Sequence, residues 1–175
     1  MIQKCSIWKV FSEFARQPGK HHHVRELARE IKLAPTSVRL HLRELEINKL
    51  IKKEKAGIYQ AYVANRNNED FRFYKKISNL IQLKESRIIE ELENKTTPDA
   101  IILFGSFEKG EDLETSDIDI FLLAKEKKLN LKLYEKKLKR TIQLHFSEDI
   151  NKLPIELQNN IANGTLLSGF VRWKT

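Results

Sequence analysis

Apolar residues in the first third of the chain recur every three or four positions, which is the spacing of one buried helix face. The pattern predicts helices at about 4–16 and 23–31 and a third helix that begins at Pro35. Proline suits the first turn of a helix, where its missing N–H costs nothing. Alternating residues then predict two strands, 50–55 and 58–64, around a turn at Ala56-Gly57.

A second helical stripe runs from about residue 69 to 93 among charged residues and predicts one long connecting helix. The same stripe is also compatible with the seam of a homodimer. Thr96-Thr97-Pro98 ends it. The remaining residues alternate between strands and helices and predict an α/β sandwich, with strands at about 100–104, 118–123, 141–146 and 166–171 and helices at 129–138 and 154–162.

The charge is distributed unevenly. Residues 1–66 contain 14 Lys and Arg against 6 Asp and Glu, whereas residues 67–175 contain 18 of each, so the whole net charge of +8 lies in the first third. Such an asymmetry favours a nucleic-acid-binding segment joined to a neutral partner. A lysine-rich solvated surface is the alternative.

The segments Val24–Ile31 and Leu33–Leu45, followed by Asn48-Lys49-Leu50-Ile51, resemble the winged helix–turn–helix of bacterial and archaeal regulators. The resemblance implies that residues 1–66 bind double-stranded DNA. The face of the third helix opposite its apolar stripe would enter the major groove, and the wing lysines would reach phosphates. The candidate DNA-binding residues are Thr36, Ser37, Arg39, His41, Arg43, Lys52, Lys53 and Lys55. A protein-binding winged helix with the same solvated residues is the alternative.

The strongest motif is Phe104-Gly105-Ser106, followed after ten residues by Asp117-Ile118-Asp119. With an apolar strand on either side, it resembles the signature of the minimal nucleotidyltransferases of the polymerase-β-like superfamily. The resemblance implies that residues 98–175 form a nucleotidyltransferase-like sheet flanked by helices. The expected chain is therefore a two-domain protein of α+β or α/β class, in which residues 67–97 connect the two domains.

Each residue of the motif has a chemical reason. Gly105 lets the backbone approach a nucleoside triphosphate, and Ser106 and Ser116 are expected to bind the nucleotide. Asp117 and Asp119 are two residues apart on a strand, so their carboxylates point the same way. We expect them to share Mg²⁺ or Mn²⁺, which would bridge the phosphates.

One position departs from the family pattern. The resemblance implies a third carboxylate on the next strand, where Gln143 and His145 are expected to face the site and Ile142, Leu144 and Phe146 the core. Neither Gln143 nor His145 is an acid. His145 can serve as a base or a ligand, so it joins Asp117 and Asp119 as a candidate catalytic residue.

Two functions follow. The chain is either a DNA-binding enzyme that transfers a nucleotidyl group to an acceptor, such as a protein or RNA, or a transcriptional regulator whose second domain only binds nucleotide. The missing acid leaves enzymatic activity undecided. No apolar run reaches the ~18 residues that cross a bilayer, and a lone Cys5 allows no internal disulfide, so we expect a cytoplasmic protein. The run His21-His22-His23 is either a metal site or, as we favour, a polar loop.

Overall fold

The computed structural model describes residues 5–172, so the outermost residues of the two predicted domains, 1–4 and 173–175, lie outside the described range. The chain divides into two compact units between Ser78 and Asn79. This division lies inside helix α4 (Glu69–Ser86).

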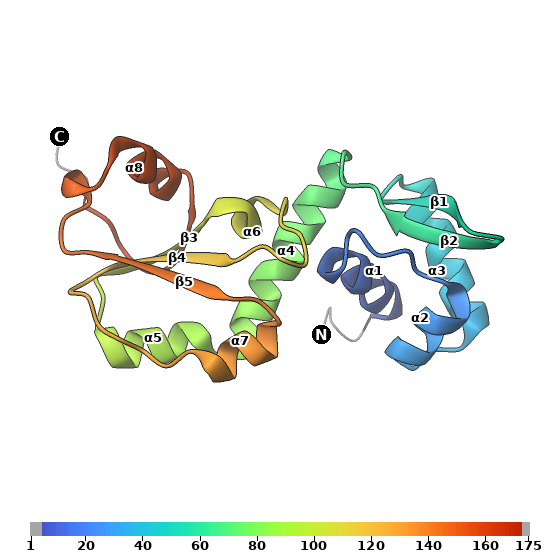
Figure 1. The fold of residues 1–175 in the computed structure, drawn as a ribbon, viewed down its shortest axis with the longest axis horizontal. Helices are drawn as coiled ribbons and strands as arrows, with labels where there is room; N and C mark the ends of the chain where they lie inside the picture. Colours follow the sequence, from blue (N-terminus) through green and yellow to red (C-terminus); the bar gives the residue numbers. More distant parts are fainter. Residues whose placement is uncertain (1–4, 173–175) are drawn as a thin grey trace. The chain divides into compact units, whose positions relative to one another are not determined.

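The first unit contains three helices followed by a β-hairpin, in the order that the sequence predicts (Figure 1). The helices are α1 (Ser6–Arg16), α2 (Val24–Ile31) and α3 (Pro35–Ile47). The hairpin consists of β1 (Ile51–Ala56) and β2 (Tyr59–Ala64), which are antiparallel. Gly57, whose φ is +64°, forms the turn together with Ile58, one residue later than expected.

One core holds these elements together. The stripe on α3 predicted from the sequence is buried: Val38 and Leu42 are fully inaccessible and pack with Phe14 of α1 and Leu27 of α2. Burial of such side chains contributes roughly 1.5–3 kcal/mol each. Because the apolar stripe of α3 faces this core, its polar face is left to solvent.

Each of the three consecutive histidines contacts the hairpin. His21 pairs with Glu54 at 3.0 Å, and His23 Nδ1 lies 3.1 Å from the carbonyl oxygen of Gln60. His22 is 1 % exposed and forms an isolated β-bridge with Tyr62 in β2. The loop before α2 therefore adds a short third edge to the hairpin, which agrees with the favoured interpretation of a loop.

We expect His22 to make the stability of the first unit depend on pH. Its ring packs against Phe14, with centroids 4.6 Å apart, and burial, helped by the nearby Lys20 ammonium, lowers the pKa of His22 from its usual 6.5. Below that pH the unfolded chain binds a proton that the folded unit excludes, so stability should fall as the pH decreases.

We therefore expect the urea midpoint of this unit to decrease progressively below pH 6.5. Trp8 packs against the same core, so its fluorescence in a Trp173→Phe background reports the transition. His22→Phe should remove most of this pH dependence, whereas His41→Gln should retain it. An unchanged slope in His22→Phe would show that another group titrates.

The second unit is built on a four-stranded sheet in the order β5-β4-β3-β6. Its strands are β3 (Ala100–Phe104), β4 (Ile118–Leu123), β5 (Ile142–Ser147) and β6 (Thr165–Gly169). β3 is antiparallel to both β4 and β6, and only β4 and β5 are parallel. The structure is therefore a mixed α+β fold rather than one built from alternating parallel strands.

Helices cover both faces of this sheet (Figure 1). α5 (Ile88–Thr96) and α7 (Lys132–Leu138) lie on one face, over Ile120 and Leu122 of β4. α8 (Ile155–Ala162) and the 3₁₀ helix η2 (Ile150–Lys152) lie on the other face, over Phe104 and Phe121. Apolar residues on both faces explain why β3 and β4 are almost continuously hydrophobic.

The single connecting helix predicted for residues 69–93 is wrong. The helix breaks at Arg87, whose φ is +64°, and α5 then continues to Thr96. The Ser86 hydroxyl donates to the Leu83 carbonyl at 2.7 Å and accepts from the Ile88 N–H at 3.2 Å, replacing helical backbone bonds. The change of direction lets Ile88 enter the core of the second unit.

The other predicted elements are present with shifted ends. α7 begins at Lys132 rather than at 129, and the last strand covers Thr165–Gly169 rather than 166–171. The short α6 (Gly105–Lys109) follows β3 directly. In the part of the chain that the structure describes, no helix is long and apolar enough to cross a membrane.

Candidate functional site

The turn from β3 into α6 brings the two halves of the motif together. Gly105 opens α6 with a φ of +79°, which side-chain-bearing residues adopt only with strain. A Cβ at this position would overlap Oδ2 of Asp119 and lie 3.2 Å from its Cγ. Both the positive φ and the carboxylate of Asp119, which packs directly on the backbone that precedes Ser106, favour glycine at this position.

The sheet register sets the direction of the acidic pair. Asp119 lies between Phe104 of β3 and Gln143 of β5. Its neighbours Ile118 and Ile120 are buried on the face under α5 and α7, so the Asp119 side chain is on the opposite face. Asp117 comes one residue before β4, in the same parity as Asp119. The carboxylates thus belong to the face that also carries Phe104.

β5 is the strand on which a third carboxylate was expected and on which the sequence has Gln143 and His145 instead. Ile142 is buried in the core under α7, with Leu144 and Phe146 packed against it, as predicted. His145 is on the other face, where its ring meets Phe104 edge-on with centroids 5.2 Å apart. Its Nε2 lies 3.5 Å from Oδ1 of Asp119. The structure therefore brings His145 beside the pair, and Gln143 is exposed on the same strand.

The two serines differ in their environment. Ser106 is the second residue of α6, directly after Gly105. The hydroxyl of Ser116 accepts a hydrogen bond from the backbone N–H of Leu113, 2.9 Å away, and so closes the turn before Asp117. The Ser116 hydroxyl therefore stabilises this turn, and its part in nucleotide binding stays a prediction.

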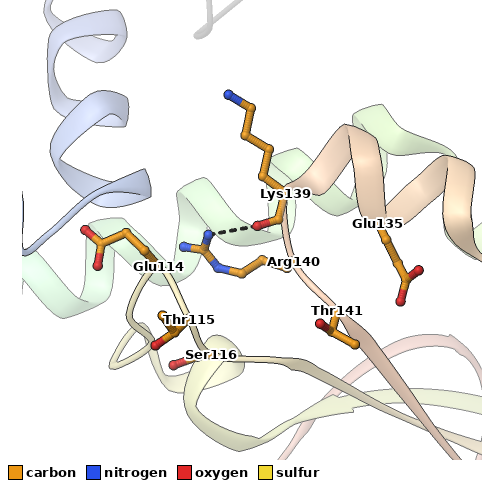
Figure 2. A pocket seen from close by; sticks show the side chains of 7 residues that line it. All are labelled: Glu114, Thr115, Ser116, Glu135, Lys139, Arg140 and Thr141. Carbon is orange, nitrogen blue, oxygen red and sulfur yellow. Dashed lines mark hydrogen bonds between the residues drawn. The ribbon is translucent and has the colours of Figure 1, made fainter.

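A hollow of about 440 Å³ adjoins Ser116, at the edge where the loop before β4 meets the turn from α7 to β5 (Figure 2). All the residues that line it are of polar or charged type: Glu114, Thr115, Ser116, Glu135, Lys139, Arg140 and Thr141. The hollow is joined to the motif strand because the N–H of Ile118 donates to the Thr141 carbonyl at 2.9 Å.

The oxygen ligands of the site suit a metal ion bound together with a nucleotide. Between residues 5 and 172, no group of three or more His, Cys, Asp or Glu side chains is arranged to hold a metal ion. Mg²⁺ is commonly bound by one or two carboxylates, with substrate phosphates completing its coordination. Asp117 and Asp119 fit a site of this kind, in which the phosphates complete the coordination, and not one in which the protein supplies every ligand.

Two buried carboxylates near the motif were missed by the sequence analysis. Glu108 is 4 % exposed and accepts a hydrogen bond from the Thr165 hydroxyl at 2.7 Å. Asp112 is 1 % exposed and accepts from Asn79. Both lie in an acid-rich stretch of a composition that is typical of a solvated loop. Their partners are more than 25 residues away in sequence, so no local pattern marks them.

The candidate DNA-binding residues lie on accessible parts of the first unit. Thr36, Arg39 and Arg43 are exposed along α3, and Ser37 and His41 are half-buried beside them. Side chains alternate between the two faces of β1, so Lys53 and Lys55 share one face and Lys52 lies on the other. Lys52 shares its face with Glu54, which pairs with His21. The residues assigned to the wing therefore form two groups.

One comparison with known proteins bears on the second unit. Residues 86–169, from the end of α4 to the end of β6, match the family model described as polymerase beta, nucleotidyltransferase. The match supports the nucleotidyltransferase-like domain that the Gly-Ser and Asp-x-Asp motif predicts for this part of the chain. Searches of curated proteins and of solved structures found no significant match to the chain.

Proposed function

We propose that the second unit transfers a nucleotidyl group from a nucleoside triphosphate to the hydroxyl of an acceptor, with Mg²⁺ or Mn²⁺ bound by Asp117 and Asp119. The observation that carries this proposal is the close packing of the Asp119 carboxylate on Gly105, the residue proposed to open the phosphate-binding turn. The family match over residues 86–169 supports the same reaction class.

The reaction needs few groups from the protein. The acceptor oxygen attacks the α-phosphorus, the new P–O bond forms, and the bond to the β-phosphate oxygen breaks to release pyrophosphate. Gly105 and the N–H groups that follow it hold phosphate oxygens, and Ser106 adds a hydroxyl donor. The metal supplies charge stabilisation when bound. His145, 3.5 Å from Asp119, is the side chain placed to take the acceptor's proton.

For the first unit we propose a winged helix–turn–helix that binds double-stranded DNA. Three helices followed by a hairpin, an exposed polar face on α3 and the charge surplus of residues 1–66 support it. Arg39 and Arg43 are one turn apart on α3, as base-reading residues of a recognition helix would be. Lys53 and Lys55, together on one face of the wing, would contact phosphates.

This proposal predicts different effects on DNA binding for substitutions on α3 and on the wing. Arg39→Ala and Arg43→Ala should weaken binding to a site selected from random duplexes about 10- to 100-fold more than binding to random DNA, because a base contact is worth roughly 1–3 kcal/mol. Lys53→Ala should weaken both alike and reduce the salt slope by about one. Fluorescence anisotropy at several salt concentrations measures all three. Equal losses on both DNAs from every variant would remove α3 from base recognition.

A second function is favoured by one specific observation. The strand beside the acidic pair offers Gln143 and His145 where an active relative is expected to offer a third carboxylate. In this alternative the chain is a transcriptional regulator, and its nucleotidyltransferase domain binds nucleotide without chemistry. Both functions require Asp117 and Asp119 to hold the metal–nucleotide complex, so only turnover separates them.

Incubation with labelled ATP, Mg²⁺ and a cell lysate distinguishes the two. An enzyme should transfer label to a discrete protein or RNA, and His145→Ala should abolish that transfer. A regulator should bind ATP without transfer. In that case Gln143→Asp or His145→Asp, which adds a third oxygen ligand beside the pair, should create transfer if the chain descends from an active enzyme.

A further inference from the structure

Residues 110–117 form the loop that joins the two halves of the motif, and the buried side chain of Asp112 connects this loop to the rest of the unit. This carboxylate is 1 % exposed, five residues before Asp117 and seven after Gly105. A buried carboxylate must be compensated by hydrogen bonds and charge. Its environment therefore shows which parts of the fold are tied to the loop.

Asn79 provides the first connection. It is also 1 % exposed, and its Nδ2 donates both to Asp112 Oδ1 and to the carbonyl oxygen of Phe107, at 2.8 Å each. Both partners are acceptors, so the orientation of the amide is fixed. Because Phe107 belongs to α6, one side chain holds the helix after Gly105 and the loop before Asp117 at the same point.

Arg140 provides the second connection, from the turn between α7 and β5. Its side chain is 7 % exposed, with Nη2 3.7 Å from Asp112 Oδ2 and Nη1 donating to the Lys139 carbonyl at 3.1 Å. Figure 2 shows the guanidinium directed from this turn toward the loop that carries Thr115 and Ser116, where it forms a wall of the polar hollow. The start of β5 is thereby tied to the same carboxylate.

We propose that Asp112 is a positioning residue for the nucleotide site. From its place between Asn79 and Arg140 it sets the distance between the phosphate-binding turn at Gly105 and the carboxylates of Asp117 and Asp119. The role rests on the proposed function of this unit, and it acts through other residues: Asp112 itself, being buried, touches no substrate. A site whose halves lie on different elements needs such support, because a displacement of about 1 Å can cost two orders of magnitude.

The test compares three variants of the full chain. Asp112→Ala removes both connections, and Asp112→Asn keeps an acceptor for Asn79 but loses the charge that faces Arg140. Ser86→Ala is the matched control, because it deletes another buried, hydrogen-bonded group of the same unit at the α4–α5 junction. The readouts are the Kd of a non-hydrolysable ATP analogue with Mn²⁺, well below all melting temperatures, and amide hydrogen exchange.

We expect Asp112→Ala to raise this Kd about tenfold or more, Asp112→Asn to raise it less, and Ser86→Ala to leave it within about twofold despite a lower melting temperature. Exchange should increase over residues 105–117 in the Asp112 variants alone. If Asp112→Ala does not fold, Asp112→Asn carries the comparison. A Kd and exchange pattern equal to those of Ser86→Ala would overturn the proposal. Wild type that fails to bind the analogue refutes the proposed function instead, and exchange alone then decides the positioning role.

Discussion

Asp117→Asn combined with Asp119→Asn should abolish the rise in melting temperature that Mn²⁺ and a nucleoside triphosphate give the wild-type chain. A ligand at one hundred times its Kd stabilises the folded state by about 2.7 kcal/mol, and this contribution should disappear. The ligand-free variant should be as stable as wild type or slightly more so, because two like charges that repel each other are removed. Differential scanning fluorimetry with and without ligands measures both effects.

The control has the same charge change elsewhere on the unit. Glu126 and Glu148 are exposed and follow β4 and β5, at the opposite ends of these strands from Asp117. Glu126→Gln with Glu148→Gln should keep the full shift. Metal alone should give little stabilisation even to wild type, since among the described residues no group of three or more His, Cys, Asp or Glu side chains is arranged to hold a metal ion. A full shift in the aspartate variant would mean that other residues bind the metal.

Gly105→Ala should also eliminate nucleotide binding, through geometry and not charge. The added methyl group would overlap Oδ2 of Asp119, and the backbone at φ +79° disfavours any side chain. We expect a Kd for the metal–nucleotide complex at least about tenfold higher, because Asp119 or the turn must move. Loss of folded stability by roughly 1–2 kcal/mol should accompany it.

Gly57→Ala is the control that separates the cost of a positive φ from the overlap with Asp119. Gly57 has a similar φ of +64°, but a Cβ there meets nothing within 4 Å. It should therefore show the backbone cost without any change in nucleotide affinity. If Gly105→Ala binds nucleotide as tightly as Gly57→Ala does, the close packing of Asp119 on the turn has no functional importance.

The sequence predicted the elements whose signals are local. The stripe of Val38 and Leu42 predicted α3, and short apolar runs predicted the strands that precede Gly105 and follow Asp117. Alternation in β5 correctly separated Ile142 from His145. Each of these features depends on a period of two or of three to four residues, which a single sequence displays.

The features that were missed depend on contacts distant in sequence. The break at Arg87 follows from two hydrogen bonds of Ser86 and from the position of Ile88 in the core, and a helical stripe that continues past Arg87 among charged residues conceals it. The burial of Asp112 depends on Asn79 and Arg140, 33 and 28 residues away. Composition alone would place such a carboxylate in solvent.

The central claim is that the site around Asp117 and Asp119 transfers a nucleotidyl group, and the position of the label in ATP tests it most directly. Purified chain, Mg²⁺ and lysate are incubated in parallel with ATP labelled at the α- or at the γ-phosphate. The account predicts that acceptor becomes labelled from the α-phosphate alone, that pyrophosphate is released in equal amount, and that the double aspartate variant does neither. Label transferred from the γ-phosphate, or transfer that persists in the double variant, would contradict it.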